Sequence, residues 1–307
     1  MITFINPRAA AGTAMKKWHK VLSTLADSRV LSAIHTMNGI ADTERPLLDA
    51  LRAGETEFVA AGGDGTVNYM LNLLLDNATP QERTRLALGG IGLGSSNDFY
   101  KPVTPSISVP TRINFESARP RDVGKITFEV NGIPRTRYFL TNASAGVTAS
   151  ANYLFNNPDT VLKALKALST PAAIMYAAMK TIGRHRNIEA QVQMPYSGPC
   201  NVNLTNLAIL KNPNVSGNFR FPVEAYYDDG RFTVCLFHNM NRRDLLHALN
   251  HLRGKGRMEE KKAVIWLADS LTVTAAQPFA VEFDGEVVST TSARFEVLPR
   301  FLKVCTC

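Results

Sequence analysis

The N-terminal part of the sequence alternates short apolar runs with longer segments whose apolar residues repeat at helical spacing. The runs have the length of buried strands, and the segments have the length of amphipathic helices. The predicted strands are residues 2–5, 31–35, 58–61 and 85–90, and the predicted helices are residues 11–26, 42–53 and 67–75. We expect Asp42 or Thr43 to cap the second helix, because short polar side chains bond the first N–H groups of a helix. Strands separated by helices form a parallel sheet covered on both faces, so a Rossmann-like α/β domain is predicted.

After about residue 123 the pattern changes to alternating, strand-like runs joined by turn dipeptides. Dipeptides of an Asn or Asp followed by Gly are typical of tight β-hairpins, because both residues tolerate a positive φ. The dipeptides with their flanking runs are Asn131-Gly132 between 126–130 and 133–140, Asp229-Gly230 between 223–227 and 231–237, and Asp284-Gly285 between 280–283 and 286–288. Residues 271–275 and 295–298 alternate as well. This part is therefore predicted to be an antiparallel β-sandwich.

Two helical segments interrupt the second domain, at 160–184 and 244–252. The first combines apolar residues with basic ones, and it is either a helix pair packed on the sandwich or a surface that faces lipid. The basic residues are Lys163, Lys166, Lys180, Arg184 and Arg186. We expect a first domain over residues 1–123, joined by a returning strand in 299–307, and a second over 124–298. The Pro-rich stretch 102–110 is predicted to be a loop.

The composition restricts the class of protein and the kind of partner. The chain has 307 residues, of which 45% are apolar and 20% charged, as expected for a globular protein with a sizeable core. Its net charge of +8 favours an anionic partner, but the basic residues are scattered and predict no nucleic-acid interface. The four cysteines form no disulfide framework, and neither a secretory signal nor an apolar run of membrane-spanning length is present. A cytoplasmic protein is expected.

Residues 60–68 carry the first candidate chemistry, a glycine-rich turn between a strand and a helix. Gly62, Gly63 and Gly65 let the backbone approach a ligand closely, and the new helix points its first N–H groups into the turn. Phosphate is the ligand that such a turn suits best. Asp64 adds a carboxylate that would hold Mg²⁺ beside the phosphates.

Two further loops follow predicted strands and are expected at the same edge of the sheet. Residues 92–99 combine glycine and hydroxyl residues with Asp98 at a predicted helix start, and residues 6–12 follow the first strand. Ligands of parallel α/β sheets bind at the carboxyl ends of the strands. The three loops together therefore predict one phosphate-binding site.

These loops resemble those of the diacylglycerol kinase-like lipid kinases, whose signature is Gly-Gly-Asp-Gly-Thr, found here at residues 62–66. The family's second segment has the form P-x-G-T-x-N-D-F-A-R, and this chain keeps its Gly, Asn, Asp and Phe at 94 and 97–99, with Ser95 for Thr and Lys101 for Arg. The stretch from Asn6 resembles the family's nucleotide loop, with Ala10 where a glycine commonly stands. The resemblance implies that catalytic Mg²⁺ is bound by Asp64 and Asp98. It implies that ATP is bound by Asn6, Thr36, Gly62, Gly63, Gly65, Thr66, Asn68, Ser95 and Asn97.

In the second domain, residues 283–286 resemble the family's Asp-Gly-Glu motif. The resemblance implies that Asp284 or Glu286 is the general base and faces Asp64 and Asp98 across a cleft. Residues 226–231 resemble a second family segment, in which an Asp and nearby carbonyl groups hold a structural Mg²⁺. That implies Asp229 as a metal ligand, with carbonyls near Tyr226 and Arg231.

The function implied by the resemblance is that of a Mg-ATP-dependent lipid kinase of phospholipid metabolism. It would phosphorylate a hydroxyl of a membrane lipid, such as diacylglycerol or a related glycerolipid, while bound peripherally to an anionic membrane surface. Two alternatives stay open: an NAD-kinase-like enzyme with a soluble substrate, and a catalytically silent lipid- or nucleotide-binding protein. Sphingosine-type relatives carry an acid for the substrate amine where this chain has Ser150, which disfavours an amino-lipid. The sequence leaves open the acceptor lipid, the choice between Asp284 and Glu286, and the oligomeric state.

Overall fold

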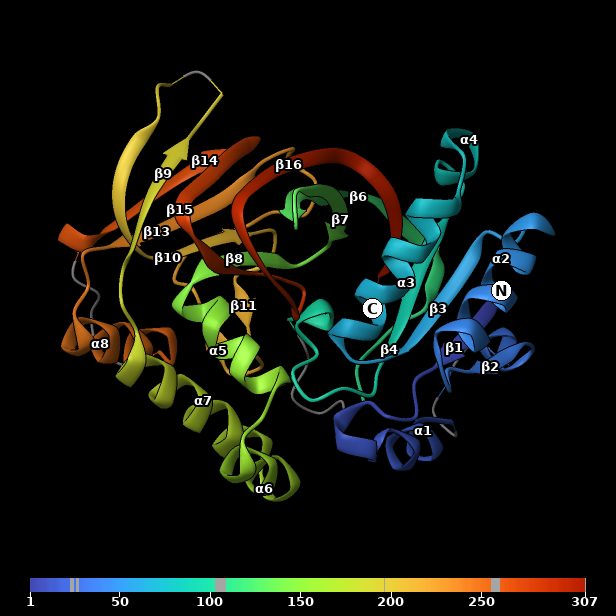
Figure 1. The fold of residues 1–307 in the computed structure, drawn as a ribbon. Coiled ribbons are helices and arrows are strands. Elements are labelled where there is room, and N and C mark those ends of the chain that lie inside the picture. The colour runs from blue at the N-terminus through green and yellow to red at the C-terminus, as the bar shows by residue number, and fades with distance from the viewer. Residues whose placement is uncertain (23–24, 26–27, 103–108, 196, 255–259, 307) are drawn as a thin grey trace. The chain divides into compact units, whose positions relative to one another are not determined.

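The computed structural model divides into two compact units, one formed by residues 1–123 with 299–307 and the other by residues 124–298. It describes the chain except for residues 23–24, 26–27, 103–108, 196, 255–259 and 307. Most of the predicted loop over 102–110 thus lies outside the described residues. Two long strands, β6 (Asn114–Val130) and β16 (Glu286–Thr306), contribute residues to both units (Figure 1).

The first unit is built on a parallel sheet. Its strands are β1 (Ile2–Ile5), β2 (Ile34–Thr36), β3 (Glu57–Gly62) and β4 (Ala87–Gly92), in the order β2-β1-β3-β4. The end of β16 pairs in parallel with β4, with Lys303 opposite Ala87, so a strand within the predicted segment 299–307 returns to this sheet. The short β5 (Thr111–Arg112) pairs antiparallel with β4. In β3, residues 58–62 are all buried, as expected of a strand covered on both faces.

Helices α1 (Ala14–Leu22), α2 (Ile40–Arg52), α3 (Asp64–Asn77) and α4 (Pro80–Arg83) connect these strands. Residues 23, 24 and 26 of the predicted first helix lie outside the described part of the chain. The predicted cap of the second helix is wrong: α2 begins two residues before Asp42, and the Thr43 hydroxyl donates to the Gly39 carbonyl at 2.9 Å. The side chain thus bonds back into the first turn and leaves the N–H groups uncapped. The predicted strand 31–35 is shorter, because residues 28–31 form a 3₁₀ turn.

The second unit is an antiparallel sheet. Strands β14 (Ala263–Ala268), β13 (Phe232–His238), β10 (Cys200–Leu210), β8 (Asn142–Gly146), β15 (Ser270–Phe283) and β16 follow one another in it. Strand β9 (Ile188–Gln193) pairs with β10 and β15, β7 (Ile133–Phe139) pairs with β6, and β11 (Asn214–Val215) pairs with β12 (Phe219–Arg220).

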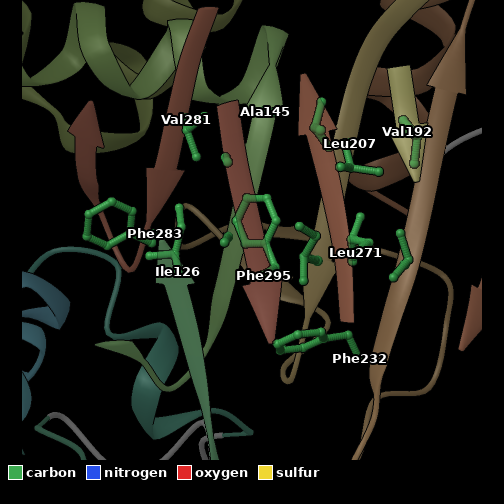
Figure 2. Packing of buried hydrophobic residues seen from close by; sticks show 14 of the residues in the cluster. Ile126, Ala145, Val192, Leu207, Phe232, Leu271, Val281, Phe283 and Phe295 are labelled. Atoms are coloured by element: carbon green, nitrogen blue, oxygen red, sulfur yellow. The ribbon is translucent and has the colours of Figure 1, made fainter. Parts of the chain in front are cut away.

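Strand alternation gives this sheet two apolar faces. Along β10, Leu207 and Ile209 belong to a core shared with β6, β7, β9, β13, β15 and β16, part of which Figure 2 shows around Phe295 and Phe232. Ala208 lies between them and belongs to a second core, with Phe237 and residues of two helices. Period-two alternation therefore buries both faces of the central strand.

The α-helices in the described part of this unit are α5 (Val147–Asn156), α6 (Thr160–Leu168), α7 (Thr170–Arg184) and α8 (Arg242–Leu252) (Figure 1). Asp159 caps α6 and Ser169 caps α7, so the predicted helix over 160–184 is a pair divided at Ser169. In the described part of the chain, no helix is long and apolar enough to span a membrane.

The Gly-containing dipeptides have different outcomes. Asn131-Gly132 and Asp284-Gly285 form the predicted hairpins, with φ of 54° and 75° and of 45° and 92°. The predicted strand before Asp229-Gly230 is wrong, because residues 223–227 adopt no strand pairing. The Glu224 carbonyl in this segment instead accepts a hydrogen bond from the Thr233 hydroxyl at 2.7 Å. The Thr233 side chain thus bonds a carbonyl group that would otherwise accept a backbone hydrogen bond from a neighbouring strand.

Candidate active site

Three loops leave the carboxyl ends of β1, β3 and β4, and backbone hydrogen bonds hold them together. The Asn6 N–H donates to Ala61 O at 2.9 Å, and the Leu93 N–H donates to Gly62 O at 2.9 Å. The Asn6 side-chain amide also donates to Thr66 Oγ1 at 3.0 Å. The loops predicted from separate stretches of sequence therefore meet in one place.

Two glycines are required for this close approach. A Cβ on Gly62 would lie 2.2 Å from Thr66 Oγ1, and a Cβ on Gly94 would lie 2.4 Å from the Gly63 Cα. Separations below 3.0 Å force a neighbour to move, and at Gly94 the neighbour is backbone. A Cβ on Gly65, by contrast, would meet nothing within 4 Å, so the space above the first turn of α3 is open. The signature thus packs Gly62 tightly against Thr66, the second loop packs Gly94 against Gly63, and space is left at Gly65.

Asp64 is the first residue of α3 and connects two of the loops. Its Oδ1 accepts a hydrogen bond from the Phe99 N–H at 2.9 Å. The neighbouring Asp98 is buried and lies 2.7 Å from the Lys101 ammonium. The helix dipole is positive at this end of α3, where the Thr66 N–H donates to the Gly63 carbonyl at 2.9 Å. The structure therefore brings two carboxylates, a lysine and a helix N-terminus to one edge of the sheet.

Lys17 is a further candidate that the sequence patterns do not indicate. It lies on α1, and its ammonium donates to the carbonyl of Gly94 in the glycine-rich loop. Burial lowers the pKa of Lys17 below its ordinary value. A half-buried cation on the carbonyl of a glycine-rich loop is suited to attract an anion. It was missed because Lys17 is 77 residues from Gly94 in the sequence and looks like one of several helix-surface lysines.

The other predicted nucleotide ligands are placed differently from one another. Asn97 adopts a φ of 53°, and its amide donates to Gly92 O at 3.0 Å, so it shapes its own loop. Asn68 is buried in α3, where its carbonyl accepts from the Asn72 amide at 2.9 Å. Thr36 and Ser95 are exposed. Ala10 adopts a φ of 50°, the conformation for which a glycine is best suited.

The donors in the first unit fit a magnesium ion that is bound together with a nucleotide. Mg²⁺ prefers oxygen ligands and is commonly held by one or two carboxylates plus substrate phosphates. Asp64 supplies such a carboxylate beside the open space at Gly65, and Asp98 supplies a second one if the ion takes the place of the Lys101 ammonium. Within the residues that the structure describes, no three His, Cys, Asp or Glu side chains gather into a set that would hold a metal without a substrate.

In the second unit, Asp284 is deeply engaged with the backbone. It is 5% exposed, and its carboxylate accepts from the N–H groups of Leu140, Thr141 and Asn142 at 2.7, 2.9 and 3.2 Å. The Thr141 hydroxyl donates to it as well. Burial raises the pKa of Asp284, while these hydrogen bonds act in the opposite direction. Asp284 thus fixes the entry to β8.

Glu286, two residues on, is exposed at the start of β16. The turn before it is held rigidly: the Gly285 N–H donates to Glu282 Oε1 at 2.7 Å, and the Asn156 amide of α5 donates to Gly285 O at 2.8 Å. Glu282 is itself buried and accepts from the Ser144 hydroxyl at 2.9 Å. The Asp-Gly-Glu motif therefore exposes the Glu286 carboxylate on a turn that the Glu282 carboxylate holds in place.

The turn at Asp229 is occupied by a lysine. The Lys211 ammonium donates to Asp229 Oδ1 and to Arg231 O, both at 2.8 Å. The Arg231 N–H donates to the same carboxylate oxygen at 3.1 Å. Tyr226 is exposed, and its phenol contacts Glu224. Of the three residues expected at a structural metal, two therefore direct oxygen atoms at an ammonium.

Comparison with known families covers nearly all of the chain. Residues 1–126 match the diacylglycerol kinase catalytic domain, and residues 141–306 match the YegS C-terminal NAD kinase beta sandwich-like domain. The prediction of an α/β domain followed by a β-sandwich is thereby confirmed.

Individual relatives agree with the family match. The diacylglycerol kinase of Bacillus subtilis is 24% identical over 307 residues, covering 97% of this chain and 93% of the relative. A "Probable lipid kinase YegS-like" of Pseudomonas aeruginosa is 27% identical over 270 residues, covering 86% and 80%. The crystal structure of a diacylglycerol kinase from Bacillus anthracis has a TM-score of 0.67 at 17% identity, covering 100% of this chain and 96% of that one. The last similarity concerns the fold.

Proposed function

The chain belongs to the diacylglycerol kinase-like lipid kinase family, and on that premise we propose that it transfers the γ-phosphate of ATP to a hydroxyl of a membrane lipid. Diacylglycerol or a related glycerolipid is the proposed acceptor, since relatives carry the name diacylglycerol kinase. The observation that supports this most strongly is the hydrogen bond from Phe99 to Asp64, which joins the two glycine-rich loops at the N-terminus of α3.

The first unit is proposed to bind the nucleotide. Its open space at Gly65 admits a phosphate, and the positive end of the helix dipole at the start of α3 stabilises the negative charge. Bound at Asp64 and Asp98, Mg²⁺ would neutralise charge that develops on the transferred phosphoryl group. The hydrogen bond to Phe99 keeps Asp64 directed toward the second loop. Lys17 adds a positive charge on the α1 side.

The second unit is proposed to supply the general base, and Glu286 is better suited than Asp284. A base must reach the hydroxyl whose proton it takes. Asp284 is 5% exposed and already accepts hydrogen bonds from Leu140, Thr141 and Asn142, whereas Glu286 is exposed on a rigid turn. Asp284 then acts by holding the turn in place.

Helices α5 and α6 offer a surface for peripheral contact with a membrane. Tyr153, Val161 and Leu168 are 57%, 53% and 83% exposed, and Lys163 lies among them. The same helices pack inward through Leu162, which is fully buried. Exposed apolar residues beside basic ones favour the surface of an anionic bilayer.

The proposal is tested with radiolabelled ATP, Mg²⁺ and a panel of vesicle-borne lipids, with products separated by chromatography. Label is expected in a glycerolipid, and Glu286→Gln is expected to abolish the transfer. Soluble hydroxyl compounds, NAD⁺ among them, form a second arm without vesicles. Label transferred only in that arm, or only hydrolysis of ATP in both, would contradict the assignment.

A further inference from the structure

Lys211 is a buried lysine whose position matches that of a cation site. Its side chain is 1% exposed, and it follows directly after β10 in the middle of the second unit. The ammonium lies 2.8 Å from Asp229 Oδ1 and 2.8 Å from Arg231 O, so it bridges a carboxylate and a backbone carbonyl. A lysine is almost never fully buried unless its charge is compensated. Here the compensation comes from the turn that the family resemblance assigns to magnesium.

Magnesium does not fit this turn as it is built. Mg²⁺ requires near-octahedral coordination at about 2.0–2.1 Å and keeps several waters, so it needs space around the oxygens of Asp229 and Arg231. The Lys211 ammonium takes that space at hydrogen-bonding distance from both oxygens. A second cation bound to the same two oxygen atoms would be repelled by the ammonium, because like charges repel at short separation.

We propose that Lys211 replaces the structural magnesium ion, so that the second unit is stabilised at this turn by its own side chain. One positive charge then satisfies the Asp229 carboxylate and the Arg231 carbonyl, as a metal would. The consequence is a turn whose stability does not depend on the concentration of divalent cations.

The lysine also connects this turn to the Asp284 turn. The backbone N–H groups of Lys211 and Asn212 both donate to Thr141 O at 2.9 Å. The Thr141 N–H donates in turn to Asp284 Oδ1 at 2.9 Å. The charge at Asp229 and the carboxylate at Asp284 are thus joined through the backbone at residues 211 and 141. Loss of the ammonium is expected to loosen both turns.

The test measures the melting temperature of the full chain in EDTA and in Mg²⁺ at matched ionic strength, without nucleotide. All variants carry Asp64→Asn, which removes the carboxylate proposed to bind magnesium in the first unit. The chain with Lys211 is expected to melt at the same temperature in both solutions. Lys211→Ser removes the ammonium and opens the space it occupied. It is expected to lower the melting temperature in EDTA, because it removes a buried side chain and the hydrogen bonds to Asp229 and Arg231. Mg²⁺ should restore part of the loss.

Two controls keep the outcome specific. Lys125→Ser breaks a more exposed ion pair, with Glu296 at 3.1 Å, and should show no response to Mg²⁺. Adding Asp229→Asn to Lys211→Ser should remove the response to Mg²⁺. If Lys211→Ser does not fold, Mn²⁺ binding to the Asp64→Asn chain, which keeps Lys211, is measured by electron paramagnetic resonance. No tightly bound ion is expected. A bound ion lost on Asp229→Asn, stability of Lys211→Ser equal to that of the parent, or no recovery in Mg²⁺ would each overturn the proposal.

Discussion

The carboxylate of Asp64 and the backbone N–H of Phe99 form a 2.9 Å hydrogen bond between residues that are 35 positions apart in the sequence. Asp64 therefore has two roles that a substitution separates. It positions the second glycine-rich loop, and it is proposed to bind magnesium. Asp64→Asn keeps an oxygen that accepts from Phe99 but loses the negative charge.

Asp64→Asn is expected to lower turnover by about a hundredfold or more, because a lost metal contact costs several kcal/mol of transition-state stabilisation. Its stability should change by about 1 kcal/mol or less, the net contribution of one hydrogen bond. Turnover is measured by the lipid assay and stability by urea unfolding. Asp76→Asn makes the same charge change on the exposed end of α3 and should leave turnover unchanged. Normal turnover in Asp64→Asn would remove Asp64 from the proposed metal site.

Gly65 and Gly94 should respond in opposite ways to alanine. Gly94→Ala forces a Cβ to within 2.4 Å of the Gly63 Cα and is expected to destabilise the chain by about 1–3 kcal/mol. Gly65→Ala meets nothing within 4 Å and should unfold at the same urea concentration as wild type or higher. Because the added methyl group enters the proposed phosphate space, ATP binding measured by calorimetry should nevertheless weaken. Undiminished affinity would place the phosphates elsewhere.

Lys17 is expected to contribute to nucleotide affinity. Lys17→Met keeps the aliphatic length and removes the charge that lies on the Gly94 carbonyl. We expect about a tenfold weaker ATP affinity, equivalent to about 1.4 kcal/mol, which is the scale of one charged hydrogen bond. Lys16→Met on the exposed side of α1 is the matched control. Equal affinities for the two variants would show that Lys17 only supports the loop.

The buried thiols of Cys235 and Cys305 should be unreactive in the native protein. Burial raises the pKa of each from 9.0 to about 12, so both stay protonated at pH 8. Exposed Cys200 is expected to react with iodoacetamide much faster, as peptide mass spectrometry on a Cys307→Ser background would show. Rapid labelling of Cys235 at pH 8 would mean that its strand opens frequently.

The same shifts predict a loss of stability in alkali. Because the native pKa values lie above the unfolded ones, the contribution of these thiols is complete below about pH 9 and is lost as the pH rises toward 12. Cys235→Val should make the urea midpoint less sensitive to pH over this range. If the urea midpoint of Cys235→Val depends on pH as that of the wild type does, other groups cause the loss of stability in alkali.

Membrane binding should depend on the outer face of α6. The double variant Val161→Ser and Leu168→Ser is expected to bind anionic vesicles about tenfold more weakly, since each exposed side chain would lose apolar burial in the bilayer. Binding of the wild type should rise with the anionic lipid fraction and fall with salt. Val264→Ser with Ile265→Ser alters two apolar residues on β14 that are each 48% exposed, and this double variant serves as the control. Tight, salt-insensitive binding to neutral vesicles would contradict the expected attraction to anionic lipid. Equal binding by both double variants would show that this face of α6 does not contact the membrane.

Local signals in the sequence predicted much of the fold. The hairpins at Asn131-Gly132 and Asp284-Gly285 can be predicted because the turn needs a positive φ at both central residues, and these residue types tolerate one. The parallel sheet was predicted from strands separated by helices, and the meeting of the loops at Gly62 and Gly92 follows from the common direction of parallel strands. These features depend on residues that are neighbours in sequence or on topology.

The features that were missed depend on contacts between distant residues. Residues 223–227 have the apolar alternation of a strand, but the Thr233 hydroxyl takes the Glu224 carbonyl. Lys211 lies 18 residues before Asp229, and no motif connects them. Periodicity and spacing indicate which side chains share a face of a helix or strand. They do not indicate which side chain from elsewhere in the sequence will contact that face.

Strand β16 has a consequence for the order of events during biosynthesis. Lys303 and Val304 of β16 pair with β4, in a sheet whose strands β1 to β4 are all encoded within the first 92 residues. Domains usually fold in the order in which the ribosome delivers them. In this protein, however, the sheet of the first unit can be completed only after the second unit has been translated. Until then, one side of β4 stays unpaired at residues 87–88. A premature stop codon just before residue 299 would therefore damage the part of the molecule that was synthesised earliest.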